Sequence, residues 1–315
     1  MKKILLAAEG ILERHVKLFE DACEGKCEFI VKRASEVTKD DLKGVNAIVG
    51  NVPAEVVAGA YDIELMQLNS AGADAYVKEG ILPKDAFLCN AVGAYGLTVS
   101  EHMLALTFDL IRHLALYRDK QKAHDFTDCG KIISIEGSTI AVLGLGDIGG
   151  SYARKVKALG AKHVIGVRRN VNAKVEGVDE IVSFDDVNKA FAKADIVAMV
   201  LPDSPNTRNL INKDTLAIMK KGAYIINVGR GTSVNQEDLL DAVRSGHIAG
   251  AALDVTNPEP LPKESPLYDE PNIFITPHVA GNFFLQETFE RMIAIAVKNV
   301  KAYILGKDLI NIVKH

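Results

Sequence analysis

The sequence predicts an α/β protein with two doubly wound parallel sheets, one following the other along a chain of 315 residues. Two observations carry this prediction. Short runs rich in Val, Ile and Leu alternate with helical stretches through most of the chain, which is typical of βαβ units. The alternation breaks once, at a long helical segment, and then starts again beside a glycine-rich turn. A chain with 48% hydrophobic residues can bury two cores at this length, so two domains are expected.

The first series of expected strands consists of the runs LLAA, FIV, AIVG, LMQL and FLCN, with turn residues between them. One long helix is expected next, from Thr98 to Asp119, with Thr98 and Glu101 placed as a capping box. Apolar positions cover more than one face of this helix, which predicts burial at a domain or subunit boundary.

The second series begins with TIAVL at Thr139 and continues through VIGV, IVAMV, AYIIN, AALDV and IFITP. Five or six parallel strands of a second sheet are expected. A last helix, from Leu285 to Leu305, has one apolar face and ends at Gly306. Because it continues no unit of the second sheet, we expect it to return to the first domain. The predicted domains are therefore 1–97 with 285–315, and 98–284.

Composition and charge indicate a small-molecule ligand. The net charge is −4 with opposite charges interspersed, so neither nucleic acid nor a membrane surface is an expected partner. No run approaches the roughly 18 apolar residues of a membrane span. The first apolar run stops at Glu9, too early for a signal peptide, which predicts a cytoplasmic protein. Cys23 and Cys27 have no His or second Cys pair nearby, so no metal site is expected.

The motif GLGDIG, Gly144 to Gly149, fits the pattern GxGxxG, follows the expected strand TIAVL and opens a helical stretch. In this context the first glycine permits a tight turn, the second lets a pyrophosphate approach the backbone, and the third allows the helix to pack on the strand. The free N–H groups at the start of the helix would face the phosphates. The segment predicts a dinucleotide site.

The residues after the next strand indicate which dinucleotide is bound. Arg168 stands 19 positions beyond Gly149, where an acidic side chain would hold the ribose hydroxyls of NAD, and Arg169 follows it. Arginine can instead pair with the 2′-phosphate of NADP. The two arginines therefore favour NADP, with NAD possible, although they could also be solvated surface cations.

Hydride transfer to or from a nicotinamide requires a proton donor and a group that holds the substrate. Three residues follow expected strands of the second series, where such groups collect: Arg230 after AYIINVG, Glu259 after AALDV, and His278 after IFITP. The other histidines, such as His102 and His113 on the long helix, are poorer candidates.

These motifs together resemble the D-isomer-specific 2-hydroxyacid dehydrogenase family over nearly the whole chain. They are, in order, QLNSAGADAY, NAVGAYGLTVSEH, GLGDIG, LPDSPNTRNLINKDTL, MKKGAYIINVGRG, AALDVTNPEPLP and ITPHVAG. The resemblance implies a Rossmann cofactor domain, which would be 98–284, and a flavodoxin-like substrate domain made of the remainder.

The resemblance also implies roles for particular residues. Arg230 would hold the substrate carboxylate and keto oxygen, a task suited to a planar charged fork. His278 would be the acid-base, giving a proton to the carbonyl oxygen during reduction, and Glu259 would hydrogen-bond it and stabilise its protonated form. The backbone N–H groups of Ala71 and Gly72 would receive the substrate carboxylate, although SAGAD could be a plain glycine turn.

The resemblance further implies a cofactor site in which Asp254 contacts the nicotinamide carboxamide, unless it only caps a turn. The other expected cofactor-binding residues, drawn from the loops after the strands, are Gly144, Gly146, Asp147, Ile148, Gly149, Arg168, Arg169, Leu201, Pro202, Thr207, Val228, Gly229, Arg230, His278 and Gly281. Phe283 and Phe284 line the substrate pocket or belong to the core or an interface.

The expected function is an NADP-preferring reductase that converts small 2-keto acids into D-2-hydroxy acids, in a homodimer held through the long helix. Two alternatives from the same superfamily are phosphoglycerate dehydrogenase and formate dehydrogenase, the latter typically carrying a longer N-terminal segment. A nicotinamide-responsive corepressor or sensor on the same scaffold is the alternative from another class of protein. The intact set of Arg230, Glu259 and His278 favours an enzyme.

Overall fold

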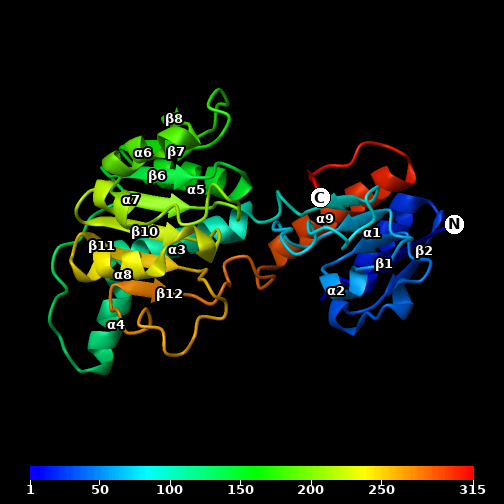
Figure 1. The fold of residues 1–315 in the computed structure, drawn as a ribbon, viewed down its shortest axis with the longest axis horizontal. Coiled ribbons are helices and arrows are strands. Elements are labelled where there is room, and N and C mark those ends of the chain that lie inside the picture. The colour runs from blue at the N-terminus through cyan, green and yellow to red at the C-terminus, as the bar shows by residue number, and fades with distance from the viewer. The chain divides into compact units, whose positions relative to one another are not determined.

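A computed structural model describes all residues from 1 to 315 and divides the chain into two compact units (Figure 1). Unit 1 comprises Met1–Tyr95 and Phe283–His315, and unit 2 comprises Gly96–Asn282. Each unit is built on its own, largely parallel sheet, so the expected α/β class with two parallel sheets is confirmed. No helix is both long enough and apolar enough to cross a membrane.

The sheet of unit 1 has the strand order β13-β5-β4-β3-β1-β2. Its strands are β1 (Lys2–Leu6), β2 (Cys27–Val31), β3 (Ala47–Val49), β4 (Leu65–Gln67), β5 (Phe87–Cys89) and β13 (Ile312–Val313). The first five are parallel in the order 2-1-3-4-5, as in flavodoxin-like domains. The sequence did not predict β13, which pairs antiparallel with β5 at the sheet edge.

The helices of unit 1 are α1 (Glu13–Cys23), α2 (Ala54–Val57) and α9 (Gln286–Ile304). Helix α9 returns from the far end of the chain and lies beside α1, orange-red next to blue in Figure 1. Its buried side chains include Phe289, Met292 and Val300, which recur at helical spacing. The last helix therefore belongs to the unit that contains the N-terminus.

The sheet of unit 2 has seven parallel strands in the order β12-β11-β10-β9-β6-β7-β8. They are β6 (Thr139–Leu143), β7 (His163–Val167), β8 (Glu180–Val182), β9 (Ile196–Met199), β10 (Ala223–Asn227), β11 (Ile248–Leu253) and β12 (Ile273–Ile275). Counted from β6, the order is 3-2-1-4-5-6 with one strand added, which is the Rossmann arrangement. The expected count of five or six strands was short by β8, a three-residue strand that begins with a glutamate.

Helices cover both faces of this sheet. They are α3 (Gly96–Arg112), α4 (Leu114–Lys122), α5 (Asp147–Ala158), α6 (Val187–Lys193), α7 (Lys213–Ile218) and α8 (Gln236–Arg244). Helices α3 and α5 pack together on one face, while α6, α7 and α8 share a core with the other face. The sheet is thus buried on both sides, and the loops at the carboxyl ends of its strands form one edge of the unit.

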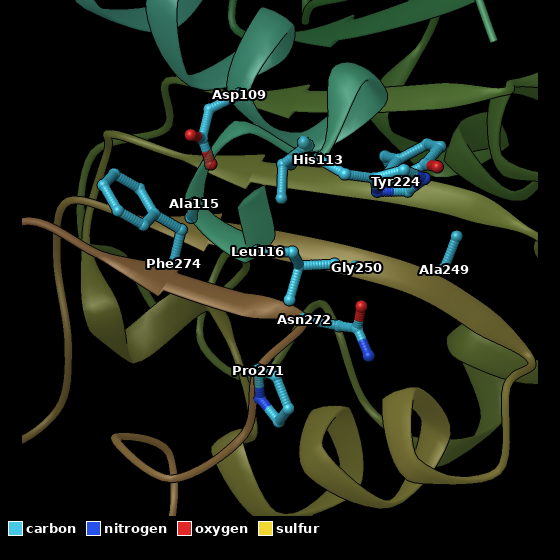
Figure 2. A pocket seen from close by; sticks show the side chains of 11 residues that line it. Asp109, His113, Ala115, Leu116, Tyr224, Ala249, Gly250, Pro271, Asn272 and Phe274 are labelled. Atoms are coloured by element: carbon cyan, nitrogen blue, oxygen red, sulfur yellow. The ribbon is translucent and has the colours of Figure 1, made fainter. Parts of the chain in front are cut away.

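The long helix expected from Thr98 to Asp119 is broken, and the prediction of a single helix was wrong. His113 has a left-handed φ of 58°, which ends α3 before α4 begins. Asp109 and His113 line a cavity of about 20 Å³, enough for one water molecule, together with residues of β10, β11 and β12 (Figure 2).

The expected capping box of Thr98 and Glu101 was also wrong, because α3 begins two residues earlier. Its first residue, Gly96, donates its backbone N–H to Oδ2 of Asp147 at 2.7 Å. Thr98 lies inside the helix, where its hydroxyl donates to the carbonyl of Ala280. The cap thus comes from the GLGDIG motif, which is distant in sequence.

Candidate active site

The glycines of GLGDIG have three different surroundings. Gly144 has a φ of 92°, and a Cβ there would lie 2.6 Å from the carbonyl oxygen of Val200. A Cβ on Gly149 would collide with the carbonyl oxygen of Gly144, so this glycine lets α5 pack against the end of β6. Gly146 has nothing within 4 Å of its Cβ position, which leaves its backbone open to a ligand. These surroundings fit the glycine roles of a pyrophosphate-binding turn.

Helix α5 begins at Asp147, with Gly146 as its N-cap and no side-chain cap. The N–H groups of its first turn therefore face outward at the positive end of the helix. The carboxylate of Asp147, an expected cofactor-binding residue, accepts the N–H of Gly96 at 2.7 Å. The backbone N–H groups of Asp147 and Ile148 lie in the first turn of α5, at the expected pyrophosphate site.

Arg168 and Arg169 follow β7 at the carboxyl edge of the sheet. Arg168 is half-buried and Arg169 is exposed, and neither guanidinium forms an ion pair. Three acidic residues follow in the β7–β8 segment. Glu176 is 83% exposed and lies 3.9 Å from Arg154, while Asp179 accepts the N–H of Val164 and Glu180 contacts His163 at the opposite end of β7. No carboxylate from this segment takes the ribose-binding position.

The loops after β9 and β10 pack against each other. A Cβ on Gly229 would lie 2.6 Å from the backbone nitrogen of Leu201, so only glycine allows this approach. Thr207 closes the first loop, because its buried hydroxyl donates to the carbonyl of Pro202 at 2.7 Å. Val228 is also buried, so these residues are closely packed at the carboxyl edge of the sheet.

Arg230 follows β10 in a turn organised by Asn227. The Asn227 amide donates to the carbonyl of Arg230 at 2.9 Å and accepts the N–H of Gly229 at 3.0 Å. The Arg230 guanidinium donates to the carbonyl of Gly229 at 2.8 Å. Sequence reasoning missed Asn227, although its place as the last residue of a buried strand was a signal that it could order the turn.

Glu259 and His278 lie in contact, as the sequence led us to expect. Nδ1 of His278 is 2.9 Å from Oε2 of Glu259, and the other carboxylate oxygen accepts the N–H of Thr256 at 3.0 Å. The contact leaves Nε2 as the ring nitrogen without a protein partner. About half of the His278 side chain is exposed, so Nε2 can meet a ligand.

A cavity of about 570 Å³ in unit 2 adjoins this pair. Most of its other lining residues are apolar or aromatic, including Leu261, Tyr268 and Ile275. Asp254 also lines the cavity, and its carboxylate is already bonded to the loop that carries His278. Glu259 and His278 are in contact at this cavity, where a reacting group could lie next to Nε2 of His278.

Asp254 holds the loop that carries His278. It follows β11, is 2% exposed, and accepts the N–H of Val279 at 2.9 Å and that of Ala280 at 3.1 Å. The hydroxyl of Thr276 donates to the same carboxylate at 2.6 Å. Both carboxylate oxygens thus accept hydrogen bonds from the protein itself, which is the turn-capping role that the sequence left open. Gly281 is the residue directly after Ala280.

The residues that the resemblance assigned to substrate binding in unit 1 follow β4. The carbonyl of Ala71 accepts the Asn90 amide, and that of Gly72 accepts the Ser70 hydroxyl. Neither backbone N–H donates to another group of the protein, so both could receive a carboxylate. Phe283 packs on the rings of Tyr95 and Phe289, whereas the following Phe284 is exposed.

Comparison with known proteins decides the family. Residues 104–280 match the model described as the NAD binding domain of D-isomer specific 2-hydroxyacid dehydrogenases. The chain belongs to this family. It is therefore an oxidoreductase, and the matched unit is its nicotinamide cofactor domain.

Similar proteins include solved members of the family. A protein of Corynebacterium melassecola, named only as uncharacterized, is 35% identical over 277 residues, or 86% of this chain and 88% of that protein. A family structure from Aeromonas salmonicida has a TM-score of 0.86 and 29% identity, covering 99% of this chain and 98% of that one. An NADPH-dependent glyoxylate/hydroxypyruvate reductase from Sinorhizobium meliloti, solved with NADP and sulfate, has a TM-score of 0.80 and 25% identity over 99% and 98%.

Proposed function

We propose that this dehydrogenase reduces small 2-keto acids to D-2-hydroxy acids with NADPH, using His278 as the acid-base. The observation that carries the proposal is the 2.9 Å contact between Nδ1 of His278 and Glu259 at the carboxyl edge of the cofactor sheet. The contact fixes the ring and leaves Nε2 as the proton donor. When bound, the nicotinamide supplies the hydride.

The chain's own residues would divide the remaining tasks. Nε2 of His278 gives its proton to the carbonyl oxygen as the alcohol forms, and Glu259 stabilises the imidazolium before that transfer. Arg230 offers a charged fork to the substrate carboxylate and to the oxygen on which negative charge grows. In unit 1, the backbone N–H groups of Ala71 and Gly72 are the proposed donors to a substrate carboxylate.

The cofactor would lie along the edge of unit 2. Its pyrophosphate meets the open backbone at Gly146 and the start of α5, and Leu201, Thr207 and Val228 line the adenosine side. Asp254 contributes by holding the loop that carries His278 more than by direct contact.

The preference for NADP rests on Arg168 and Arg169. Neither guanidinium forms an ion pair, and Arg168 stands directly after β7, where an acidic residue would repel a 2′-phosphate. The NADP-bound reductase from Sinorhizobium meliloti shows that the family includes NADPH-dependent members. NAD remains the second cofactor to test.

A homodimer is part of the proposal. Large apolar side chains are exposed between the end of α3 and β6, namely Phe108, Leu114, Tyr117, Phe126 and Ile132. Helix α4 has no buried residue of its own. A second copy of the chain would cover this surface. The cytoplasmic location stays a prediction.

The test is an assay of purified protein with NADPH and a panel of 2-keto acids that includes glyoxylate and hydroxypyruvate, followed by absorbance of the reduced nicotinamide. Oxidation of NADPH with at least one of these acids, and a product of D configuration by chiral chromatography, is expected. No oxidation with any acid and either cofactor would refute the enzyme function and leave a sensor or corepressor as the alternative.

A further inference from the structure

We propose that His102 is a positioning residue for the reaction, acting through Thr276 and Asp254 on the loop that carries His278. Sequence reasoning gave His102 no role. It lies in the second turn of α3 (Gly96–Arg112), and its side chain is 23% exposed. It is thus placed to act through its contacts, without touching the reacting atoms.

The contacts of His102 lead to the loop that carries His278. Its Nε2 lies 3.1 Å from Oγ1 of Thr276 and 3.6 Å from Oδ1 of Asp254. Thr276 is the residue directly after β12, and its hydroxyl is 2.6 Å from the same carboxylate oxygen. The three side chains therefore form one connected group beneath the loop.

The hydrogen positions in this group follow from counting protons. The Asp254 carboxylate accepts two backbone N–H groups, as an ionised carboxylate does. The single proton of the Thr276 hydroxyl then points to Asp254, so its oxygen must accept from His102. Nε2 of His102 consequently carries a proton and donates it, with the buried negative charge 3.6 Å away.

The loop needs this support because its backbone is unusual. His278 has a φ of 51°, a left-handed conformation that residues with a side chain rarely adopt. Its N–H lies 2.8 Å from the backbone carbonyl of Asp254 and 3.0 Å from that of Thr276. The next two N–H groups bind the Asp254 carboxylate. Asp254 therefore holds the backbone at His278 and directly after it.

The orientation of the Asp254 carboxylate thus sets the position of the His278 ring. A rotation of the carboxylate would move the imidazole relative to the substrate. Misplacement of a reacting group by about 1 Å can lower a rate by about 100-fold. By donating to Thr276, His102 keeps the carboxylate in the orientation that the loop requires.

The inference rests on the proposed function where the readout is turnover, and it is tested with matched variants of the whole chain. His102→Leu removes the donor, whereas His102→Gln keeps an N–H at a similar reach. We expect kcat to fall about 10- to 100-fold in His102→Leu. The dissociation constant for NADPH should stay near the wild-type value, and His102→Gln should recover most of the lost kcat.

Thr276→Val provides a second route, because it removes the hydroxyl that links His102 to Asp254 and keeps the side-chain shape. It should lower kcat to a similar degree. It also tests the same connection if His102→Leu does not fold. The double variant should lose little more than either single variant, since both break one connection. His247→Leu is the control: it removes an imidazole contact with the carbonyl of Leu216 elsewhere in unit 2 and should leave kcat unchanged.

Amide hydrogen exchange gives a readout without substrate. The N–H groups of Val279 and Ala280 should exchange faster in His102→Leu than in the wild type and the His247→Leu control. Unchanged exchange, an unchanged kcat, or a Gln variant no better than Leu would overturn the inference. If the wild-type protein turns over no 2-keto acid, the proposed function fails, and the exchange measurement alone decides the role of His102.

Discussion

Glu259 holds His278 with one carboxylate oxygen, at 2.9 Å from Nδ1, and accepts the N–H of Thr256 with the other. The two residues come from successive loops, after β11 and after β12, which are neighbouring parallel strands. Each loop thus restrains the other, and the histidine ring is oriented before any ligand arrives. Preorganisation of this kind lowers the cost of reaching the transition state.

Glu259→Gln should impair catalysis more than binding. The amide cannot stabilise an imidazolium as a carboxylate does, so we expect kcat to fall by about 100-fold or more. The KM for the keto acid should change much less. Steady-state kinetics with NADPH at saturation measure both constants, and a variant with wild-type kcat would show that the contact is only structural.

Arg168→Asp should reverse the cofactor preference. Loss of a charge-assisted contact to the 2′-phosphate weakens NADPH binding by about 10- to 100-fold, and the new carboxylate can accept the ribose hydroxyls of NADH. Fluorescence titration with both reduced cofactors measures the change. Lys162→Asp, at the opposite end of β7, is the matched charge reversal and should leave the preference intact. If Arg168→Asp also leaves it intact, the arginines are surface charges.

The exposed apolar surface between α3 and β6 should hold two copies of the chain together. Phe126 is fully exposed and Leu114 is 53% exposed, so the change of both to Glu should shift the protein from dimer to monomer. Sedimentation velocity at micromolar concentration reports the mass. Tyr61→Glu, at an 88% exposed aromatic residue of unit 1, should not alter it. A wild-type protein that sediments as a monomer would contradict the proposal.

Asp203 should make the stability of the folded protein depend on pH. Hydrogen bonds from Arg208 and then from Thr232 lower the pKa of Asp203 to about 2. Because the pKa is lower in the folded than in the unfolded chain, its stabilising contribution is present above about pH 4 and is lost as the pH falls toward 2. Asp203→Asn should therefore lower the melting temperature at pH 7 but hardly at pH 2, as calorimetry would record. A difference that is independent of pH would contradict this assignment.

The sequence predicted those features of the fold that depend on local pattern. The strand TIAVL at Thr139–Leu143 has the expected bounds, and the predicted run VIGV lies within β7, because each is a buried apolar run with turn residues at its end. Strand β8 was missed since it is short and begins with a charged residue. Strand β13 was missed because its two residues gain a strand conformation only by pairing with β5.

Contacts between segments that are distant in sequence could not be predicted from the sequence. The cap of α3 comes from Asp147, 51 positions after the Gly96 that it binds. The break at His113 depends on a left-handed backbone that apolar periodicity does not reveal. At the candidate site, the sequence identified Glu259 and His278 through the resemblance, but not the group of side chains that supports the loop of His278.

The role of His278 is decided by comparing the wild-type protein with His278→Ala. Both are assayed with NADPH and the best 2-keto acid of the panel, and NADPH binding is measured separately by titration. We predict that the variant binds NADPH as the wild type does while its turnover falls by about 10²- to 10⁴-fold, the contribution expected of a general acid. Turnover by the variant at the wild-type rate would contradict the central role of the His278–Glu259 pair.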